Sequence, residues 1–202
     1  MEATTGTPGS RVRDALGRAI HEAGAIDREV YAAIARTPSP TLDEGLRVLS
    51  NAANHSKLWF GLAGGLALLG GSRGRRAALA GIAAIGVTSP LVNLGVKALH
   101  ERARPDRAGA GVPEERHVRM PESPSFPSGH SASGFAFAAA VGHEIPALAL
   151  PLRFLAASVA YSRVHTGVHY PGDALVGSLL GAGTGSIVAR VLDRRLRRRS
   201  AG

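Results

Sequence analysis

The chain has 202 residues, with 24 lysine and arginine residues against 15 aspartate and glutamate residues and no cysteine. This length fits one domain with a core of its own, and a chain without cysteine has neither a disulfide framework nor a thiolate metal site. The net charge of +9 is not accompanied by a nucleic-acid-reading motif or by supporting aromatic residues, so we expect no nucleic-acid partner.

The N-terminal quarter of the chain is charged and amphipathic. Residues 1–10 show no apolar pattern and predict a disordered start. From Arg11 to Ala35, apolar residues recur every three or four positions among charged ones, which predicts an amphipathic helix with a candidate break at Gly24. Residues 1–50 contain no apolar signal segment, so the first apolar helix is expected to act as its own insertion signal.

A second helix is predicted after the turn at residues 37–40, because Thr41 and Glu44 form a capping-box signature. For residues 11–56 as a whole we expect amphipathic helices that lie on a bilayer surface or pack on the rest of the protein. Taken alone, the region is equally compatible with a soluble helical hairpin.

The remainder of the chain is far more apolar. Residues 77–96 are twenty consecutive uncharged residues, about the number that a helix needs to cross a bilayer core of roughly 30 Å. Four shorter uncharged runs also suit the core helices of a soluble bundle. They span residues 58–72, 131–142, 154–162 and 174–189. Because these runs are rich in glycine and alanine, they favour helices packed closely in lipid. We predict an all-α integral membrane helical bundle of about five apolar helices over residues 57–192.

Nine arginines lie beside the apolar runs. They are Arg73, Arg75, Arg76, Arg190, Arg194, Arg195, Arg197, Arg198 and Arg199. Arginines close to the ends of spans mark cytoplasmic loops, so residues 193–202 are predicted to be a basic cytoplasmic tail. Counting crossings from the first cluster places the long polar segment 97–129 on the extracytoplasmic side. We therefore expect a multi-pass protein of the cell membrane, although the arginines of that segment run against this orientation.

Polar side chains gather at the helix ends that face the extracytoplasmic side. They are Lys97, Arg102, Arg104, Ser128, His130, Arg163, His165, His169 and Asp173. Cations greatly outnumber anions in this set, and guanidinium forks match the oxygens of phosphate. Because the set lacks a carboxylate cluster for Mg²⁺ or Ca²⁺, we expect an anion site whose positive charge comes from the protein, with no metal and no other cofactor.

Two histidines are candidates for chemistry. The PSGH segment, residues 127–130, precedes an apolar helix whose free N–H groups attract anions, although such a turn by itself is more typical of a helix cap. His169 is followed four residues later by Asp173, which can orient the imidazole so that its other nitrogen attacks phosphorus while His130 protonates the leaving oxygen. His165 has no acidic neighbour in the sequence and is expected to pack or to form a hydrogen bond at the rim.

Three segments match, in order, the motifs of a known family. KALHERARP at residues 97–105 resembles the K-x6-R-P motif of the type 2 phosphatidic acid phosphatase superfamily. PSGH at residues 127–130 resembles its second motif, and SRVHTGVHYPGD at residues 162–173 its S-R-x5-H-x3-D motif. The match has no gap and no substitution and covers residues 97–173, whereas the first fifty residues add nothing specific.

The resemblance implies a membrane bundle that hydrolyses phosphate esters or anhydrides without a metal, through a phosphohistidine. On this pattern His169 is the nucleophile, Asp173 its partner and His130 the acid for the leaving group. The groups that would bind the phosphoryl oxygens are Lys97, Arg104, Ser128, Gly129 and Arg163. Arg102 and His165 occupy variable positions of the motifs, so no role carries over to them.

The predicted function is therefore that of a membrane lipid phosphatase. Its expected substrate is a phosphomonoester or diphosphate on a lipid, of the phosphatidic acid, phosphatidylglycerophosphate or polyprenyl phosphate type. The frequent alanine, glycine and arginine residues favour a GC-rich bacterial source, in which polyprenyl carriers of cell-wall synthesis are natural candidates. Two alternatives stay open: a vanadium-dependent haloperoxidase that holds vanadate in place of phosphate, and a non-enzymatic lipid-binding membrane protein. The sequence leaves the oligomeric state open.

Overall fold

The structure is a computed structural model that describes residues 8–99 and 101–200. Within these residues it contains helices and no strand, which confirms the predicted all-α class. The α-helices are α1 (Pro8–Arg36), α2 (Pro40–Ala52), α3 (Lys57–Leu69), α4 (Gly71–Pro90), α5 (Gly129–Glu144), α6 (Ala149–His165) and α7 (Pro171–Ser200).

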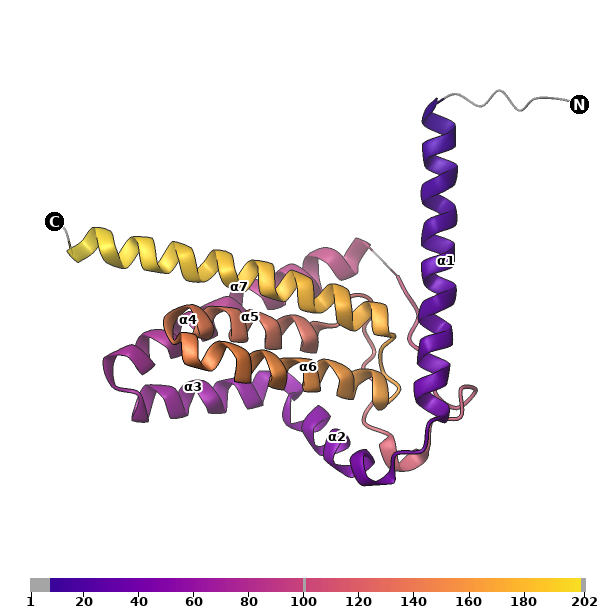
Figure 1. Cartoon of the computed structure of the whole chain (residues 1–202), viewed down its shortest axis with the longest axis horizontal. Helices are drawn as coiled ribbons and strands as arrows, with labels where there is room; N and C mark the ends of the chain where they lie inside the picture. Colours follow the sequence, from indigo (N-terminus) through magenta and orange to yellow (C-terminus); the bar gives the residue numbers. More distant parts are fainter. Residues whose placement is uncertain (1–7, 100, 201–202) are drawn as a thin grey trace, which may run out of the picture.

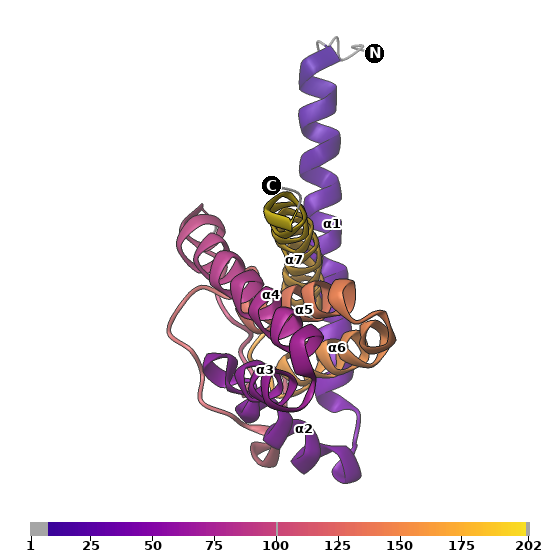
Figure 2. The ribbon, with the colours of Figure 1, turned by 90° about the vertical axis from the view of Figure 1, so that its left-hand side faces the viewer.

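Helices α3 to α7 form a bundle, and α1 stands across one end of it (Figure 1). Helix α5 lies inside the bundle and packs against α4, α6 and α7, as the end-on view in Figure 2 shows. One part of the core is built around Trp59 and Phe137, which are fully buried and whose ring centroids lie 5.5 Å apart. Helix α2 packs against α6. The two N-terminal helices thus surround the end of the bundle at which α6 stops and α7 starts.

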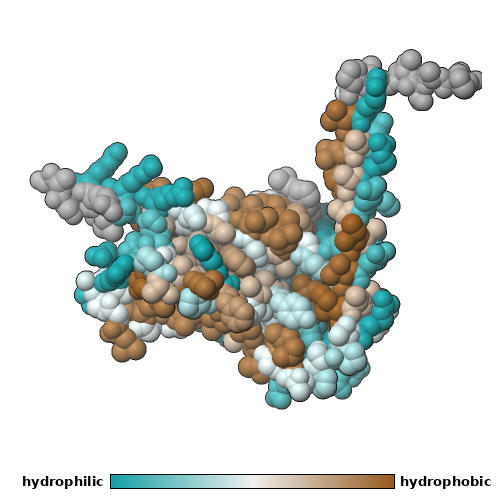
Figure 3. All heavy atoms as spheres, viewed as in Figure 1, coloured by the Kyte–Doolittle hydropathy of each residue, from teal (hydrophilic) through white to brown (hydrophobic). Residues whose placement is uncertain are grey.

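The bundle has the lengths and the outer surface of a membrane protein. Helices α3 and α5 have 13 and 16 residues, too few to cross a bilayer core unaided. Three stretches are long and apolar enough to do so: Gly71–Val96, Pro146–His165 and Pro171–Arg195. Large apolar side chains project outward from the bundle, among them Leu69, Phe154 and Leu179, which are 89 %, 74 % and 64 % exposed. Figure 3 shows this hydrophobic outer surface, which is suited to lipid.

The start of the chain differs from the sequence prediction. Helix α1 begins at Pro8, so residues 8–10 of the expected disordered start are helical, whereas residues 1–7 lie outside the described residues. The candidate break at Gly24 is wrong, because α1 passes through it without interruption. A glycine inside a helix costs only about 1 kcal/mol relative to alanine, which the neighbouring turns offset.

The predicted capping box of α2 is also wrong. The helix begins at Pro40, before Thr41, because proline is already constrained to the backbone angle of a first helical residue. Ser39 is the residue at the cap, and its hydroxyl donates to the Asp43 carboxylate at 2.8 Å and to no backbone group. At the other end of the chain, α7 continues to Ser200, so the described part of the predicted basic tail is helical.

Helices α5 and α7 approach each other along a row of glycines. Gly177, Gly181 and Gly185 follow one another at four-residue spacing on α7, so they share one face of that helix. A Cβ on Gly181 would overlap the carbonyl oxygen of Ala132, and a Cβ on Gly185 would overlap that of Ala136. The glycine and alanine content seen in the sequence therefore allows the helix backbones to touch, as in lipid-embedded bundles.

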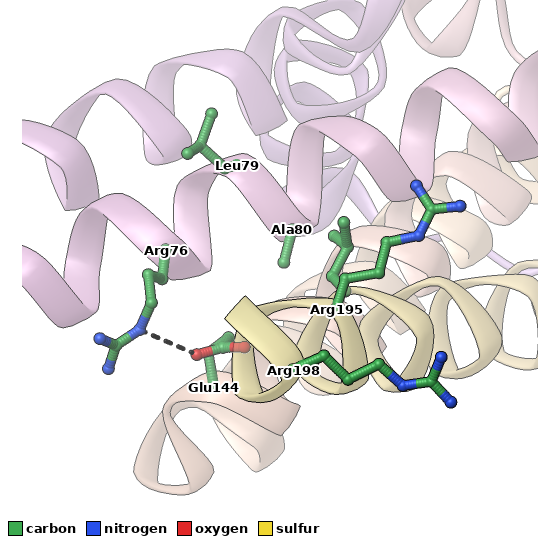
Figure 4. Close-up of a pocket in the computed structure, with 7 residues that line it drawn as sticks. Arg76, Leu79, Ala80, Glu144, Arg195 and Arg198 are labelled. Carbon is green, nitrogen blue, oxygen red and sulfur yellow. Dashed lines mark ion pairs between the residues drawn. The ribbon is translucent and has the colours of Figure 1, made fainter. Parts of the chain in front are cut away.

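The end of the bundle away from α1 is rich in arginine. A cavity of about 580 Å³ opens there between the start of α4, the end of α5 and the end of α7. Figure 4 shows Arg76 directed toward Glu144, with Nε and Oε2 3.7 Å apart, while Arg195 and Arg198 extend from α7. The arginines that the sequence places beside apolar runs thus lie together at one end of the bundle.

The glycine row predicts opposite effects for two neighbouring substitutions on α7. Gly181→Ala should lower the free energy of unfolding by about 1–3 kcal/mol, because the new methyl group must push α5 away. Gly183→Ala is the matched control: its methyl group would meet no atom within 4 Å, so it should leave stability unchanged or raise it by up to about 1 kcal/mol. Thermal unfolding of the two variants in one detergent measures the difference. Equal midpoints would show that α5 and α7 are not in backbone contact.

Candidate active site

The predicted site residues meet at the end of the bundle nearest α1. Residues 97–129 correspond to the predicted long connection; a π-helical segment, Leu91–Val96, joins it to α4, and it ends at the start of α5. Its described residues contain only short 3-10 helical segments. A pocket of about 270 Å³ opens between this connection and the helix ends. Five of the eight predicted site residues line it: Lys97, Arg104, Gly129, His130 and His169. The other three are at most 1 % exposed: Ser128, Arg163 and Asp173.

His169 is held between an anion and a cation. Its Nδ1 lies 3.4 Å from Asp173 Oδ2, and its Nε2 lies 3.3 Å from Nη1 of Arg104. A carboxylate accepts a hydrogen bond and a guanidinium donates one. The two neighbours therefore favour the tautomer with the proton on Nδ1 and the lone pair on Nε2, the form that a histidine nucleophile requires.

The environment keeps this imidazole uncharged. Burial, followed by the positive charges of Arg104 and Arg163, lowers the pKa of His169 to about 4, and this lowering outweighs the opposite effect of Asp173. Above about pH 5 the ring is neutral. Its lone pair is then available without a separate base to remove a proton.

Asp173 is fixed by several donors in the first turn of α7. Its Oδ2 accepts the backbone N–H of Tyr170 at 2.9 Å and a short hydrogen bond from the hydroxyl of Ser125. Ser125 Oγ also lies 3.5 Å from Nδ1 of His169, at the limit of hydrogen bonding. The carboxylate is fully buried, so these bonds replace the water that it would otherwise need.

Two cations face the pocket from its connecting segment. Arg104 donates from Nε to the Ser123 carbonyl at 2.9 Å and from Nη1 to the Val168 carbonyl at 2.7 Å, which anchors it beside His169. Lys97 donates from Nζ to Ser123 Oγ at 3.2 Å. Burial and the nearby charge of Arg104 lower the pKa of Lys97 to about 8.

Arg163 lies deeper than the sequence indicated. The uncharged run that predicts this helix ends at Ser162, but α6 continues to His165, and Arg163 lies in its last turn. Nη1 of Arg163 donates to Ser50 Oγ at 2.6 Å, while its buried Nε has no hydrogen-bond partner among the described residues. Ser162 donates to the Val159 carbonyl at 2.7 Å, so its proton serves the helix and not the pocket.

The PSGH segment forms the start of α5, two residues before the predicted start. Ser128 is the N-cap, and its hydroxyl oxygen accepts the backbone N–H of Ser131 at 3.4 Å. A Cβ on Gly129 would lie 3.1 Å from the Asn93 side chain, tighter than an ordinary contact, so a side chain there would crowd the pocket wall. Nε2 of His130 lies 2.9 Å from Oδ1 of Asn54, an acceptor, so His130 carries its proton on that nitrogen.

Three participants were missed in the sequence. Arg102, to which no role was given, donates from Nη1 to Asp173 Oδ1 at 2.8 Å and from Nη2 to Asp27 at 2.7 Å. His165 is buried, not at the rim, and its Nε2 lies 2.9 Å from the Asp43 carboxylate on α2. Asn54 belongs to a turn in which His55 and Ser56, both lining the pocket, have φ of 54° and 58°. Asp27, Asp43 and Asn54 all come from the N-terminal region, which has no motif.

Comparison with known proteins identifies the family. The family model of the PAP2 superfamily matches residues 76–197, which contain all the predicted site residues. The chain belongs to the PAP2 superfamily. Its matched PAP2 region starts within α4 and ends within α7, so the N-terminal helices α1 to α3 lie outside it.

The PAP2 relatives include mycobacterial proteins of one name, decaprenylphosphoryl-5-phosphoribose phosphatase. The protein of Mycobacterium tuberculosis is 42 % identical over 105 residues, which are 52 % of this chain and 55 % of the relative. The chain thus matches about half the length of that relative. The protein of Mycolicibacterium smegmatis is 34 % identical over 152 residues, which are 73 % of this chain and 77 % of the relative.

Two solved PAP2-like structures share the fold. The transmembrane PAP2-type phosphatidylglycerolphosphate phosphatase of Bacillus subtilis superposes with a TM-score of 0.67 at 24 % identity, over 90 % of this chain and 92 % of the other. LpxE of Aquifex aeolicus gives a TM-score of 0.64 at 25 % identity, over 80 % of this chain and 93 % of the other. The first match covers nine tenths of this chain, so the likeness of fold extends beyond the region matched by the family model.

The lowered pKa of Lys97 predicts how this PAP2 pocket binds anions. Inorganic phosphate keeps a constant charge between pH 8 and 10, but Lys97 loses its proton as the pH rises through about 8. The affinity for phosphate should therefore fall over this range, and Lys97→Arg should retain it because a guanidinium stays protonated. Phosphate-induced shifts of the thermal midpoint in EDTA measure both affinities. A parallel decline in the two proteins would show that Lys97 does not contact the anion.

Proposed function

We propose that this protein hydrolyses a phosphate ester or anhydride of a lipid through a phosphohistidine formed on His169. The observation that carries the proposal is the orientation of His169 in the pocket. Its Nδ1 lies against Asp173, and its Nε2 faces the cationic side of the pocket beside Arg104. Membership of the PAP2 superfamily and the names of the mycobacterial relatives support the same reaction class.

The first chemical step transfers the phosphoryl group to the protein. Nε2 of His169 attacks phosphorus, and the bond from phosphorus to the leaving oxygen breaks. Asp173 stabilises the positive charge that develops on the imidazole as its Nδ1–H is retained. His130, which takes up a second proton when the negatively charged phosphate is bound, gives the proton on its Nδ1 to the leaving oxygen while its Nε2–H remains on Asn54. The lipid then departs as a neutral alcohol or as a lipid phosphate.

The second step restores the enzyme. Neutral His130 accepts a proton from water, whose oxygen attacks phosphorus. The bond between phosphorus and Nε2 breaks, and its electron pair returns to the imidazole. Inorganic phosphate is released, and His130 is again protonated, so the proton balance closes over one turnover.

The charge developing on the phosphoryl oxygens is met by fixed donors. Lys97 and Arg104 line the pocket, and the Gly129 N–H belongs to the first turn of α5, where helix N–H groups have no helical acceptor. Arg163 is assigned to the same group, since its charge acts on His169 and its Nε is free for an anion. Such pre-organised donors stabilise the transition state because they need not reorient during the reaction.

A polyprenyl-linked phosphate is our first candidate for the substrate. The mycobacterial relatives are named for a decaprenylphosphoryl phosphoribose, and they are more similar in sequence than the solved phosphatase structures. The position of the pocket at the end of the apolar bundle suits a phosphate at the level of the lipid headgroups. Phosphatidic acid, phosphatidylglycerophosphate and polyprenyl diphosphates are the competing substrates to compare.

The proposed reaction predicts the behaviour of purified protein. Phosphate release from lipid phosphates should proceed in EDTA and be inhibited by vanadate. His169→Asn should lower kcat about a thousandfold or more, because no other group forms the intermediate. His143→Asn is the matched control on the exposed far end of α5 and should keep full activity.

Two outcomes would contradict the proposal. Halide oxidation with vanadate and peroxide, in the absence of phosphate release, would identify a haloperoxidase. Lipid binding without release of phosphate from any substrate of the panel would identify a non-catalytic protein.

The active-site end is proposed to face the extracytoplasmic side of the cell membrane, because the arginines of α4 and α7 lie at the other end. The chain has no cysteine, so single cysteines can be labelled without interference. Glu122→Cys lies in the exposed connection near the pocket, and Ser72→Cys lies exposed at the arginine-rich end. A membrane-impermeant maleimide should label the first on intact cells and the second only after permeabilisation. The reverse pattern would refute this orientation.

A further inference from the structure

Helix α1 runs across the bundle and not along it. The long helices α4, α6 and α7 run roughly side by side, and α1 stands nearly perpendicular to them at the active-site end (Figures 1 and 2). In a bilayer crossed by the long helices, α1 must therefore run parallel to the membrane surface. Its 29 residues extend for about 43 Å at 1.5 Å per residue, well beyond the edge of the bundle.

The apolar side of α1 faces the membrane in this arrangement. Val12, Leu16 and Ile20 lie four residues apart on one stripe and are 68 %, 60 % and 65 % exposed. Arg18 and Glu22 lie on the opposite side of the helix. In Figure 3 the hydrophobic atoms of α1 are on the side toward the bundle, and the hydrophilic atoms are on the side away from it. The stripe thus continues the apolar surface of the bundle into the plane of the headgroups.

The second half of α1 is attached to the candidate active site. Oδ1 of Asp27 accepts the backbone N–H of Gly172 at 2.6 Å, at the start of α7. One turn further along α1, the ring of Tyr31 packs edge-on against that of Tyr170, with centroids 5.3 Å apart. The guanidinium of Arg102 lies over the ring of Tyr170, 4.2 Å from its centroid. The helix is therefore fixed to the turn that carries the catalytic pair.

Arg102 connects α1 to the catalytic carboxylate. Its Nη2 donates to Asp27 Oδ2 at 2.7 Å and its Nη1 to Asp173 Oδ1 at 2.8 Å, so one guanidinium joins two carboxylates. With Oδ1 held by Arg102, Asp173 presents Oδ2 to Nδ1 of His169. Arg102 does not line the pocket, and both of its Nη atoms already donate to carboxylates.

We infer that α1 is a bilayer-surface helix that, through Asp27 and Arg102, positions Asp173 and His169 relative to the membrane. The partner of its apolar face is the lipid of the leaflet at the active-site end. Asp27 and Arg102 are positioning residues: they act through Asp173 and touch neither substrate nor phosphate. The positioning part of this inference rests on the proposed function, whereas the placement of α1 does not.

The placement of α1 is tested by the depth of two labels. Leu16→Cys and Arg18→Cys lie on opposite sides of the same turn, and each is labelled with a fluorophore in the otherwise cysteine-free chain. The protein is reconstituted in phosphatidylglycerol and phosphatidylcholine vesicles that contain a lipid with a nitroxide near the top of its acyl chain. The label at position 16 should be quenched several-fold more than the label at position 18. Equal quenching of the two labels would overturn the placement, and the result requires no catalytic activity.

The positioning role is tested by kinetics with a lipid phosphate that the wild-type protein hydrolyses. Arg102→Gln and Asp27→Asn should each lower kcat about tenfold and change KM less than twofold, because they disturb the orientation of His169 and not the anion site. The double variant should lose less than the product of the two single losses, because Asp27 and Arg102 are in contact and position the same turn. Arg119→Gln, at an exposed arginine of the same connection, is the matched control and should retain the wild-type kcat.

Three results separate the possible failures. Wild-type kcat in both single variants, or additive losses in the double variant, would overturn the positioning role. A rise in KM at unchanged kcat would place Arg102 in the anion site and would also overturn it. Absence of phosphate release by the wild-type protein would refute the proposed function. The placement of α1 on the bilayer surface would still be tested by the quenching of the two labels.

Discussion

The hydrogen bonding of the buried Asp173 carboxylate is the interaction on which the rest of this structure depends. A carboxylate without water is costly unless several donors surround it, and here they come from separate parts of the chain. Ser125 and Arg102 reach it from the long connection, Tyr170 from the turn before α7, and His169 from the same turn. The carbonyl of Asp173 also accepts the N–H of Ser128, which ties the start of α5 to the start of α7. The hydrogen bonds of this one residue thus join the long connection to the starts of α5 and α7.

Close helix packing makes this assembly possible. A Cβ on Gly177 would overlap the Ser128 carbonyl, so the glycine row of α7 reaches the cap of α5 itself. The same row continues for two turns into the apolar part of the bundle, where van der Waals contact between backbones replaces the hydrophobic effect as the source of association. The position of the PSGH segment beside His169 and Asp173 is therefore set by the glycines of α7.

The sequence predicts the parts of this protein whose causes are local. The uncharged runs became α3 to α7, and the three motifs indicated the residues that meet at one pocket. Prediction from the sequence failed for features that depend on contacts between residues far apart in the chain. The uncharged run that predicts α6 ends at Ser162, yet the helix continues through Arg163, whose Nη1 donates to Ser50 Oγ of α2. The charged side chain of Arg163 is buried, so it does not mark the end of the helix.

The links from the N-terminal region were invisible for the same reason. Asp27 lies 75 residues from Arg102, and Asp43 lies 122 residues from His165. The spacing of residues in the sequence does not show such pairings, and Arg102, two residues before Arg104, has the sequence context of an ordinary exposed arginine. Hydrophobic patterning predicts which face of a helix is apolar. It does not predict which carboxylate pairs with which cation, because that depends on the folded structure.

The length of α7 links the thickness of the bilayer to the height at which the candidate active site lies. Its first turn carries Asp173, and its last turns carry arginines that are most stable at the level of the opposite headgroups. The uncharged stretch between them, residues 174–189, is about 24 Å long, somewhat less than a typical hydrocarbon core of roughly 30 Å. The arginine side chains must therefore extend along the helix toward the headgroups, or the bilayer must thin around it. Hydrophobic mismatch thus sets how far the pocket stands above the hydrocarbon, and with it which lipid phosphates, by the height of their headgroups, come level with His169.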